Sequence, residues 1–232
     1  MPENIGRASR KLKSQALLVD LDGTLVDPSE AFSEAARKTL QRFGSAYNSE
    51  EVGMDIARHL QLNLPLDECL DKVAIDEASR KRFLETFLQY FYEVAPHKTK
   101  LLPNVSKTLR RFSKNLSLAL VTRRFMPKKL VREELKRLRV DRYFATVVTS
   151  LEVERPTPSP DAILKAAEEL RVQIQNCVVV SDSGVDIRAG RAAGAKTVAV
   201  LSGLFTEEEL RKEKPDLILE NINDLPEHIL AV

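Results

Sequence analysis

Four short apolar segments, each followed at once or within a few positions by a polar or charged residue, constrain the fold of this chain more than any other feature. They are residues 16–19, 116–121, 145–148 and 177–181. Each is long enough for a strand and too short for an ordinary helix, and unbroken apolarity is typical of a strand covered on both faces. Ligands of open parallel sheets bind at the carboxyl edge of the strands, so we expect the polar residues to gather there.

The first of these segments runs directly into Asp20 and Asp22, followed by Gly23. Two carboxylates at a strand end repel each other and lose hydration, a cost that a bound cation offsets. The pair therefore indicates a metal site with a candidate nucleophile. Asp-Gly is also a strong two-residue turn signal, so a hairpin is the alternative. A hairpin would account for this motif but not for the polar residues after the other three segments.

Four motifs follow one another along the chain. They are residues 20–25 (Asp-Leu-Asp-Gly-Thr-Leu), an apolar strand ending at Thr122, residues 155–158 (Arg-Pro-Thr-Pro), and residues 181–186 (Ser-Asp-Ser-Gly-Val-Asp) followed by Ala193-Gly194. In these residues the chain resembles the haloacid dehalogenase superfamily, specifically its phosphoglycolate-phosphatase-like branch. The first motif matches that family completely. The third has Arg where Lys is usual, and the fourth has Ser where Gly is usual.

The resemblance implies a phosphatase that acts on a small phosphorylated metabolite. A phosphate monoester is a dianion that resists anionic attack, so the enzyme must neutralise it, orient a nucleophile and protonate the leaving oxygen. Asp20 is the candidate nucleophile, which would form a phosphoaspartyl intermediate. Asp22 would protonate the leaving group and then take a proton from the hydrolytic water.

Carboxylate and carbonyl oxygens suit Mg²⁺, which keeps several waters and also contacts substrate phosphate. The resemblance implies three metal ligands: the Asp20 side chain, the Asp22 backbone carbonyl and Asp182. Asp186 is expected to orient the site from behind these ligands, with direct or water-mediated metal contact left open. For Asp182 and Asp186 the alternative is a favourable place at a helix N-terminus, which is compatible with the functional role.

The substrate phosphate would be held by the Thr122 hydroxyl and the Arg155 charge, and the resemblance adds Gly23 and Thr24 to this set. We also hypothesise that Arg123, next to Thr122, holds the phosphate or an acidic group beyond it. Thr122 could instead be present only because β-branched residues are common in strands, and Arg155 could be a solvent-exposed charged residue of a loop.

Arg155 is the main departure from the family pattern. Guanidinium is a wide planar fork whereas lysine carries a compact charge on a flexible stem, so the exchange is not conservative. It would either preserve function with altered geometry or mark a weakened catalyst. The smaller departure, Ser181, requires only that the backbone there avoid a conformation reserved for glycine.

Residues 28–95 form an insertion between the first and second motifs, much longer than the roughly 15 residues above which structureless connections become uncommon. Helical spacing of apolar residues predicts helices over residues 31–43, 51–60 and 76–92. We interpret the insertion as a small helical cap domain placed after the first strand, with Pro28 and residues 96–103 as the two crossings. The aromatic residues along 83–91 could line a substrate pocket, although packing inside the bundle is the more ordinary role.

Beyond the insertion, helices and strands alternate. Helices are expected at 104–114, 127–139, 161–171 and 185–193, and further strands at 197–201 and 217–219. This alternation predicts an α/β fold with a Rossmann-like parallel sheet and helices on both faces. The expected organisation is a basic N-terminal tail over 1–15, an α/β core (catalytic) domain over 16–27 and 96–232, and the helical cap domain over 28–95.

Composition limits the remaining function classes. A net charge of +2 over 232 residues gives no argument for nucleic acid or a membrane as partner, and no apolar stretch approaches the roughly 20 residues that span a bilayer. Two distant cysteines and three scattered histidines predict neither a disulfide framework nor a zinc site, and fit a cytoplasmic location. We expect a monomer or homodimer.

The sequence thus predicts a Mg²⁺-dependent phosphatase of small phosphorylated metabolites, with phosphoglycolate one candidate substrate. Two alternatives stay open. The motif residues do not separate a phosphatase from a phosphomutase, in which a sugar hydroxyl replaces water. Arg155 leaves room for a phosphate-binding module that has lost activity.

Overall fold

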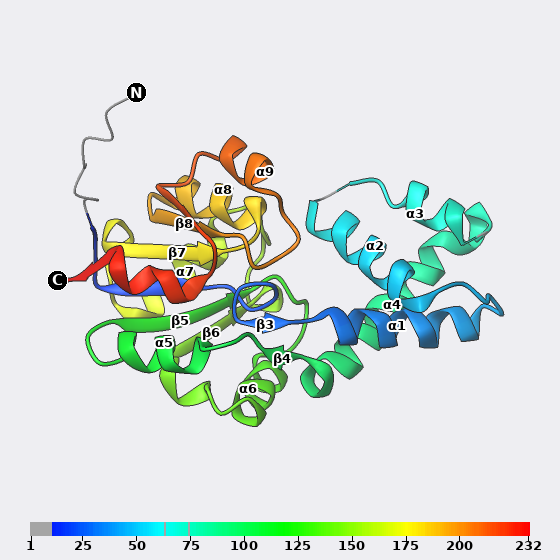
Figure 1. Cartoon of the computed structure of the whole chain (residues 1–232), viewed down its shortest axis with the longest axis horizontal. Helices are drawn as coiled ribbons and strands as arrows, with labels where there is room; N and C mark the ends of the chain where they lie inside the picture. The colour runs from blue at the N-terminus through cyan, green and yellow to red at the C-terminus, as the bar shows by residue number, and fades with distance from the viewer. Residues whose placement is uncertain (1–10, 63, 74) are drawn as a thin grey trace, which may run out of the picture.

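The computed structural model describes residues 11–62, 64–73 and 75–232. The chain forms a domain built on a parallel sheet, which we call the sheet domain, and a helical insertion beside it (Figure 1). The C-terminus lies at the end of the sheet domain far from the insertion (Figure 1). Within the described residues, no helix has both the length and the apolarity needed to cross a membrane.

The sheet is six-stranded and parallel, in the order β6-β5-β2-β7-β8-β9. Its strands are β2 (Ala16–Val19), β5 (Ser117–Thr122), β6 (Thr146–Thr149), β7 (Cys177–Ser181), β8 (Lys196–Val200) and β9 (Leu217–Leu219). The four apolar segments form the four strands β6, β5, β2 and β7 side by side, as predicted. The chain order reverses on the two sides of β2, which places the switch point of the sheet there.

Helices cover both faces of the sheet, which confirms the predicted α/β class (Figure 1). They are α5 (Val105–Phe112), α6 (Lys128–Arg137), α7 (Asp161–Leu170), α8 (Gly184–Ala193) and α9 (Glu207–Lys212). Within β2, Leu17 and Val19 belong to the core shared with α5 and α6, whereas Ala16 and Leu18 belong to the core shared with α7 and α8. Both faces of the strand are therefore buried, and this explains its unbroken apolar sequence.

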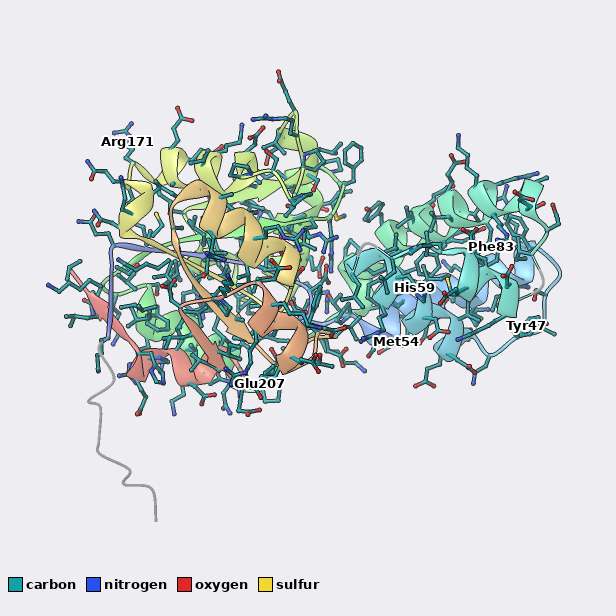
Figure 2. The ribbon with its side chains drawn as sticks, turned by 90° about the horizontal axis from the view of Figure 1, so that it is seen from above. Tyr47, Met54, His59, Phe83, Arg171 and Glu207 are labelled. Carbon is teal, nitrogen blue, oxygen red and sulfur yellow. The ribbon has the colours of Figure 1, made fainter. Side chains whose placement is uncertain are left out.

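The described residues of the insertion form four helices, α1 (Ser29–Arg42), α2 (Ser49–Leu62), α3 (Asp67–Lys72) and α4 (Glu77–Lys98). Phe83 and Phe87 are fully buried among them, so most of the aromatic residues along α4 pack inside the bundle. Figure 2 shows Met54 of α2 near the sheet domain and Tyr47 at the far end of the insertion. The two crossings pair as short antiparallel strands, β3 (Val26–Asp27) and β4 (Lys100–Leu101).

The structure corrects two boundaries and adds two short helices. Residues 1–10 of the predicted N-terminal tail lie outside the described residues, but β1 (Leu12–Ser14) pairs in parallel with β10 (Ile229–Ala231), so the tail does not extend to residue 15. Helix α4 continues through Pro96 to Lys98, beyond the predicted cap boundary at 95. The short helices α3 and α9 were not expected from the sequence. Four 3₁₀ segments complete the fold: Asp141–Tyr143, Ser150–Glu152, Ile174–Asn176 and Ile222–Glu227.

Candidate active site

Polar residues from three neighbouring strands converge at the carboxyl edge of the sheet. In β2, Val19 lies opposite Leu120 of β5 and Val180 of β7, so the residues that follow these strands are brought to one place. A cavity of about 230 Å³ lies between this edge and the insertion. From the sheet domain it is lined by Asp20, Asp22, Thr122, Arg123, Arg124, Asp182, Ser183 and Asp186. The predicted meeting of the early and late acidic residues therefore occurs.

Ser181 connects two of the buried acids. Its hydroxyl lies 3.0 Å from Asp186 Oδ2 and 3.3 Å from Asp20 Oδ2, and can donate its one proton to either. The hydroxyl in turn accepts from the Ser183 N–H at 3.0 Å. Ser181 does not occur among the described residues with positive φ, so serine is tolerated where the family usually has glycine.

Asp182 is held by Thr24 and closely surrounded by two glycines. The Thr24 hydroxyl donates to Asp182 Oδ1 at 3.0 Å and accepts from the Asp182 N–H at 2.9 Å. A Cβ at Gly23 or Gly203 would clash with the Asp182 carboxylate, and Gly23 also has φ of +79°. No group of the described residues donates to the buried Oδ2 of Asp182. Gly23 and Thr24 are not among the residues that line the cavity, and their observed contacts place the Asp182 carboxylate.

The acids are held in an environment that disfavours negative charge. Burial, followed by the charges of Asp186, Asp182 and Asp22, raises the pKa of Asp20 well above its usual value. Burial raises the pKa of Asp182 to about 7, although the Thr24 hydroxyl opposes the rise. Burial also raises the pKa of Asp186, against the opposing charge of Arg123 and hydrogen bonds from Ser181 and Thr157. A cation bound among these carboxylates would offset both their lost hydration and the repulsion between their negative charges.

The donor set suits a hard divalent cation. Within the part of the chain that the structure describes, no three His, Cys, Asp or Glu side chains are arranged to hold a metal. The predicted set needs only two side chains, those of Asp20 and Asp182, with the Asp22 carbonyl as third oxygen. Magnesium commonly binds one or two carboxylates and keeps several waters, and the orphaned Asp182 Oδ2 offers an unused acceptor.

Asp22 is bound through both carboxylate oxygens by Arg124. The Arg124 guanidinium donates from Nε to Oδ2 at 2.7 Å and from Nη2 to Oδ1 at 2.6 Å. Its Nη1 donates to Glu134, whose other oxygen accepts from the Thr99 hydroxyl at 2.5 Å. Arg124 and Glu134 are buried. Burial lowers the pKa of Arg124, but the charges of Asp22 and Glu134 outweigh it and leave the pKa raised.

Arg123 spans the cavity from the sheet domain to the insertion. Its Nη1 donates to Ser183 Oγ and its Nη2 to the Leu60 carbonyl of α2, both at 3.2 Å. It lines the cavity with Thr122, which is 3% exposed at the end of β5. Both side chains thus line the cavity in which the sequence analysis expects the substrate phosphate.

Arg155 does not reach the cavity. Its side chain is 75% exposed and binds Asp161 at the start of α7, from Nε at 3.0 Å and from Nη2 at 2.9 Å. The guanidinium therefore does not lie where the sequence analysis expected it, beside the other residues assigned to the substrate phosphate, because a nearby carboxylate satisfies it at the surface. Thr157, two residues later, approaches Asp186 instead.

Comparison with known proteins agrees with this geometry. The family model for haloacid dehalogenase-like hydrolases matches residues 17–200, which include all four motifs. The chain belongs to the haloacid dehalogenase-like hydrolase family. The protein is therefore an enzyme of a hydrolase family. The motif residues of that family include Asp20, Asp22, Thr122 and Asp182, which lie together at one edge of the sheet.

Two relatives and one solved structure show the extent of the family likeness. A phosphoglycolate phosphatase of Escherichia coli is 32% identical over 225 residues, 89% of this chain and 88% of its own length. A pyrophosphatase of Oceanobacillus iheyensis is 27% identical over 213 residues, 91% of this chain and 94% of its own. A haloacid dehalogenase-like hydrolase structure from Streptococcus pneumoniae has a TM-score of 0.75 and 19% identity, covering 92% of this chain and 97% of that one, and supports the fold.

The sequence analysis did not predict the contacts that three residues make around the site. These residues are Arg124, Glu134 and Ser181. Glu134 carried a signal, because it lies three positions after Val131 and one before Leu135, on the apolar face of a helix. A charged residue on such a face needs a buried partner. The sequence did not indicate which of the chain's many cations that partner would be.

Proposed function

We propose that this haloacid dehalogenase-like protein is a Mg²⁺-dependent phosphatase that hydrolyses a small phosphate monoester through a phosphoaspartyl intermediate. The observation that carries the proposal is the position of Asp20. It is 8% exposed, lines the cavity, and lies with Asp182 and Asp186 in a cluster of buried carboxylates whose environment favours a cation. Its relatives include a phosphoglycolate phosphatase and a pyrophosphatase, whose names state hydrolysis of a phosphate ester and of pyrophosphate.

Each residue has a defined task in this proposal. An Asp20 carboxylate oxygen attacks phosphorus, and the bond between phosphorus and the ester oxygen breaks. Asp22 gives a proton to the departing oxygen and afterwards takes one from the water that hydrolyses the aspartyl phosphate. The Thr122 hydroxyl donates to a phosphate oxygen, and Arg123 supplies the positive charge that Arg155 does not bring to the cavity.

Magnesium would be held by Asp20, the Asp22 carbonyl and Asp182, and would supply charge neutralisation for the phosphate dianion. Thr24, Gly23 and Gly203 keep Asp182 in place for this purpose. Ser181, which can donate to either Asp20 or Asp186, would hold these two carboxylates in place beside the metal.

The test is turnover of an aryl phosphate with Mg²⁺ and after removal of metal by a chelator. We expect turnover only with Mg²⁺, together with acid-stable ³²P incorporation that the Asp20→Asn variant lacks. Turnover that survives both the chelator and the Asp20 substitution would contradict the proposal. A lack of turnover under all conditions would favour a phosphate-binding module, and discharge of the phosphoenzyme by an added sugar phosphate rather than water would favour a mutase.

A further inference from the structure

Charge is divided sharply between the two walls of the cavity. Every charged lining residue comes from the sheet domain. Among the described residues, the wall contributed by the insertion consists of Phe32, Ala57, Leu60, Leu88, Phe91 and Tyr92. Since the phosphate would lie against the sheet-domain wall with the nucleophile, this second wall faces the rest of the substrate.

The insertion wall is apolar and firmly packed. The rings of Phe32 and Phe91 stack with centroids 4.4 Å apart, and Phe91 continues into the buried core of the insertion. Of the described residues in this wall, Tyr92 alone brings a side-chain polar atom, and its hydroxyl oxygen already accepts from the Phe125 N–H at 3.2 Å. A tyrosine hydroxyl retains one proton to donate, which suits a single neutral acceptor.

The cations of the opposite wall are already engaged by groups of the protein. Arg124 binds Asp22 and Glu134, and its guanidinium lies 5.4 Å from the Phe91 ring centroid. Arg123 binds Ser183 and the Leu60 carbonyl. With Arg123 assigned to the phosphate and Arg124 paired with two carboxylates, no other cation among the described lining residues would meet a second anionic group, which would lie against Leu and Phe side chains.

We propose, on the basis of the phosphatase function above, that the substrate carries an uncharged and largely apolar leaving group, such as a small aromatic or branched alkyl alcohol. Moving a carboxylate or a second phosphate from water to the insertion wall loses hydration without a compensating ion pair. A compact apolar group instead gains the free energy of burial against Phe32, Leu88 and Phe91. The cavity is smaller than the roughly 300 to 1,000 Å³ common for ligand sites, which favours a compact leaving group.

The wild-type protein tests this directly with benzyl phosphate and phosphoglycolate, both of which release a primary alcohol. We expect kcat/KM with Mg²⁺ to be at least about tenfold higher for benzyl phosphate, the scale on which apolar pockets discriminate. Equal values, or a preference for phosphoglycolate, would overturn the inference while leaving the phosphatase proposal intact. Failure of both substrates to show chelator-sensitive turnover would remove the phosphatase proposal and the inference with it.

A charge introduced into the wall provides the second test. Leu88 is partly buried on α4 and lines the cavity, whereas Leu84, one turn earlier on the same helix, is also partly buried but does not line it. Leu88→Arg should lower kcat/KM for benzyl phosphate and raise it for phosphoglycolate, each by roughly tenfold. Leu84→Arg is the matched control and should leave the ratio of the two values unchanged, with folding of both variants checked by thermal unfolding. If the ratio shifted equally in both variants, or in neither, the insertion wall would not be the surface that contacts the leaving group. If either variant fails to fold, the comparison of the two substrates with the wild-type protein remains the test of the inference.

Discussion

Arg124 donates to both carboxylate oxygens of Asp22, at 2.7 and 2.6 Å, although the two residues are 102 positions apart in the chain. This bidentate pair fixes the plane of the carboxylate that the proposed mechanism uses as acid and base. Arg124 is itself fixed by Glu134, and Glu134 by the hydroxyl of Thr99 at the end of α4. The orientation of Asp22 thus depends on residues that do not touch the reacting atoms.

Replacing Arg124 with Met should leave Glu134 buried without its counter-ion. Breaking a buried pair in this way costs about 3 to 5 kcal/mol of unfolding free energy, so we expect a large fall in stability in a denaturant titration. We also expect kcat to fall by roughly 10²-fold, the scale of a misplaced catalytic group, with a smaller change in KM.

The double variant Arg124→Met/Glu134→Met separates the effect of Arg124 on the orientation of Asp22 from its effect on the stability of the protein. It removes both buried charges and should recover most of the lost unfolding free energy, since apolar replacements of a buried ion pair are often neutral or better. The loss in kcat should persist, because Asp22 still lacks its bidentate partner. Recovery of kcat together with stability would show that Arg124 acts only through folding.

The Asp20→Asn variant should be inactive yet at least as stable as the wild type in metal-free buffer. Loss of the nucleophile predicts a fall in kcat of at least about 10³-fold. Burial and three neighbouring acids raise the pKa of Asp20, so an ionised carboxylate there is unfavourable without a cation, and an amide of similar shape relieves this. Thermal unfolding in the presence of a chelator measures the second effect; a marked loss of stability would contradict it.

Magnesium should stabilise the protein more at pH 8 than at pH 5.5. The pKa of Asp182 in the folded protein is raised to about 7 from an ordinary value of 3.8, so between these values the folded state binds a proton that the unfolded state does not. Stability without metal therefore falls as the pH rises through this window, and Mg²⁺ competes with the proton. At 100 times its Kd the ion would add about 2.7 kcal/mol.

Thermal shifts with and without Mg²⁺ at the two pH values test this expectation. Asp182→Asn should remove most of the Mg²⁺-dependent shift, because it replaces the carboxylate that has an unused buried oxygen. Asp161→Asn, on the partly exposed start of α7 and outside the set of residues that line the cavity, is the control and should retain the shift. An undiminished shift in the Asp182 variant would place the metal elsewhere.

The sheet and the position of the acids could be predicted because local pattern and long-range contact coincide there. An unbroken apolar segment such as residues 16–19 indicates a strand buried on both faces, and the carboxyl ends of parallel strands share one edge. Asp20, Thr122 and Asp182 therefore meet whatever the details of the loops. The short α3 and α9, of six residues each, carry too few turns for a periodic signal.

Side-chain direction could not be predicted in the same way. Arg155 follows the family motif in position, but its guanidinium is directed by Asp161, a local partner that sequence spacing does not identify as the stronger one. The pairing of Arg124 with Asp22 and Glu134 depends on how β5 and α6 pack beside β2. Such choices are made by three-dimensional packing and not by the residues adjacent in the chain.

Replacing Arg123 and replacing Arg155 should have very different effects on kcat/KM. Arg123 lines the cavity, so Arg123→Ala should lower kcat/KM by roughly 10²-fold or more, as expected when a charge on a phosphate is lost. Arg155 is 75% exposed and paired with Asp161, so Arg155→Ala should lower kcat/KM by less than about threefold, since exposed ion pairs contribute little. Steady-state kinetics of both variants on one aryl phosphate make the comparison, with circular dichroism to confirm folding. A large loss for Arg155→Ala would mean that the residues following β6 rearrange when substrate binds and bring the guanidinium to the phosphate, and the cation of the site would then be the one that the family motif indicates.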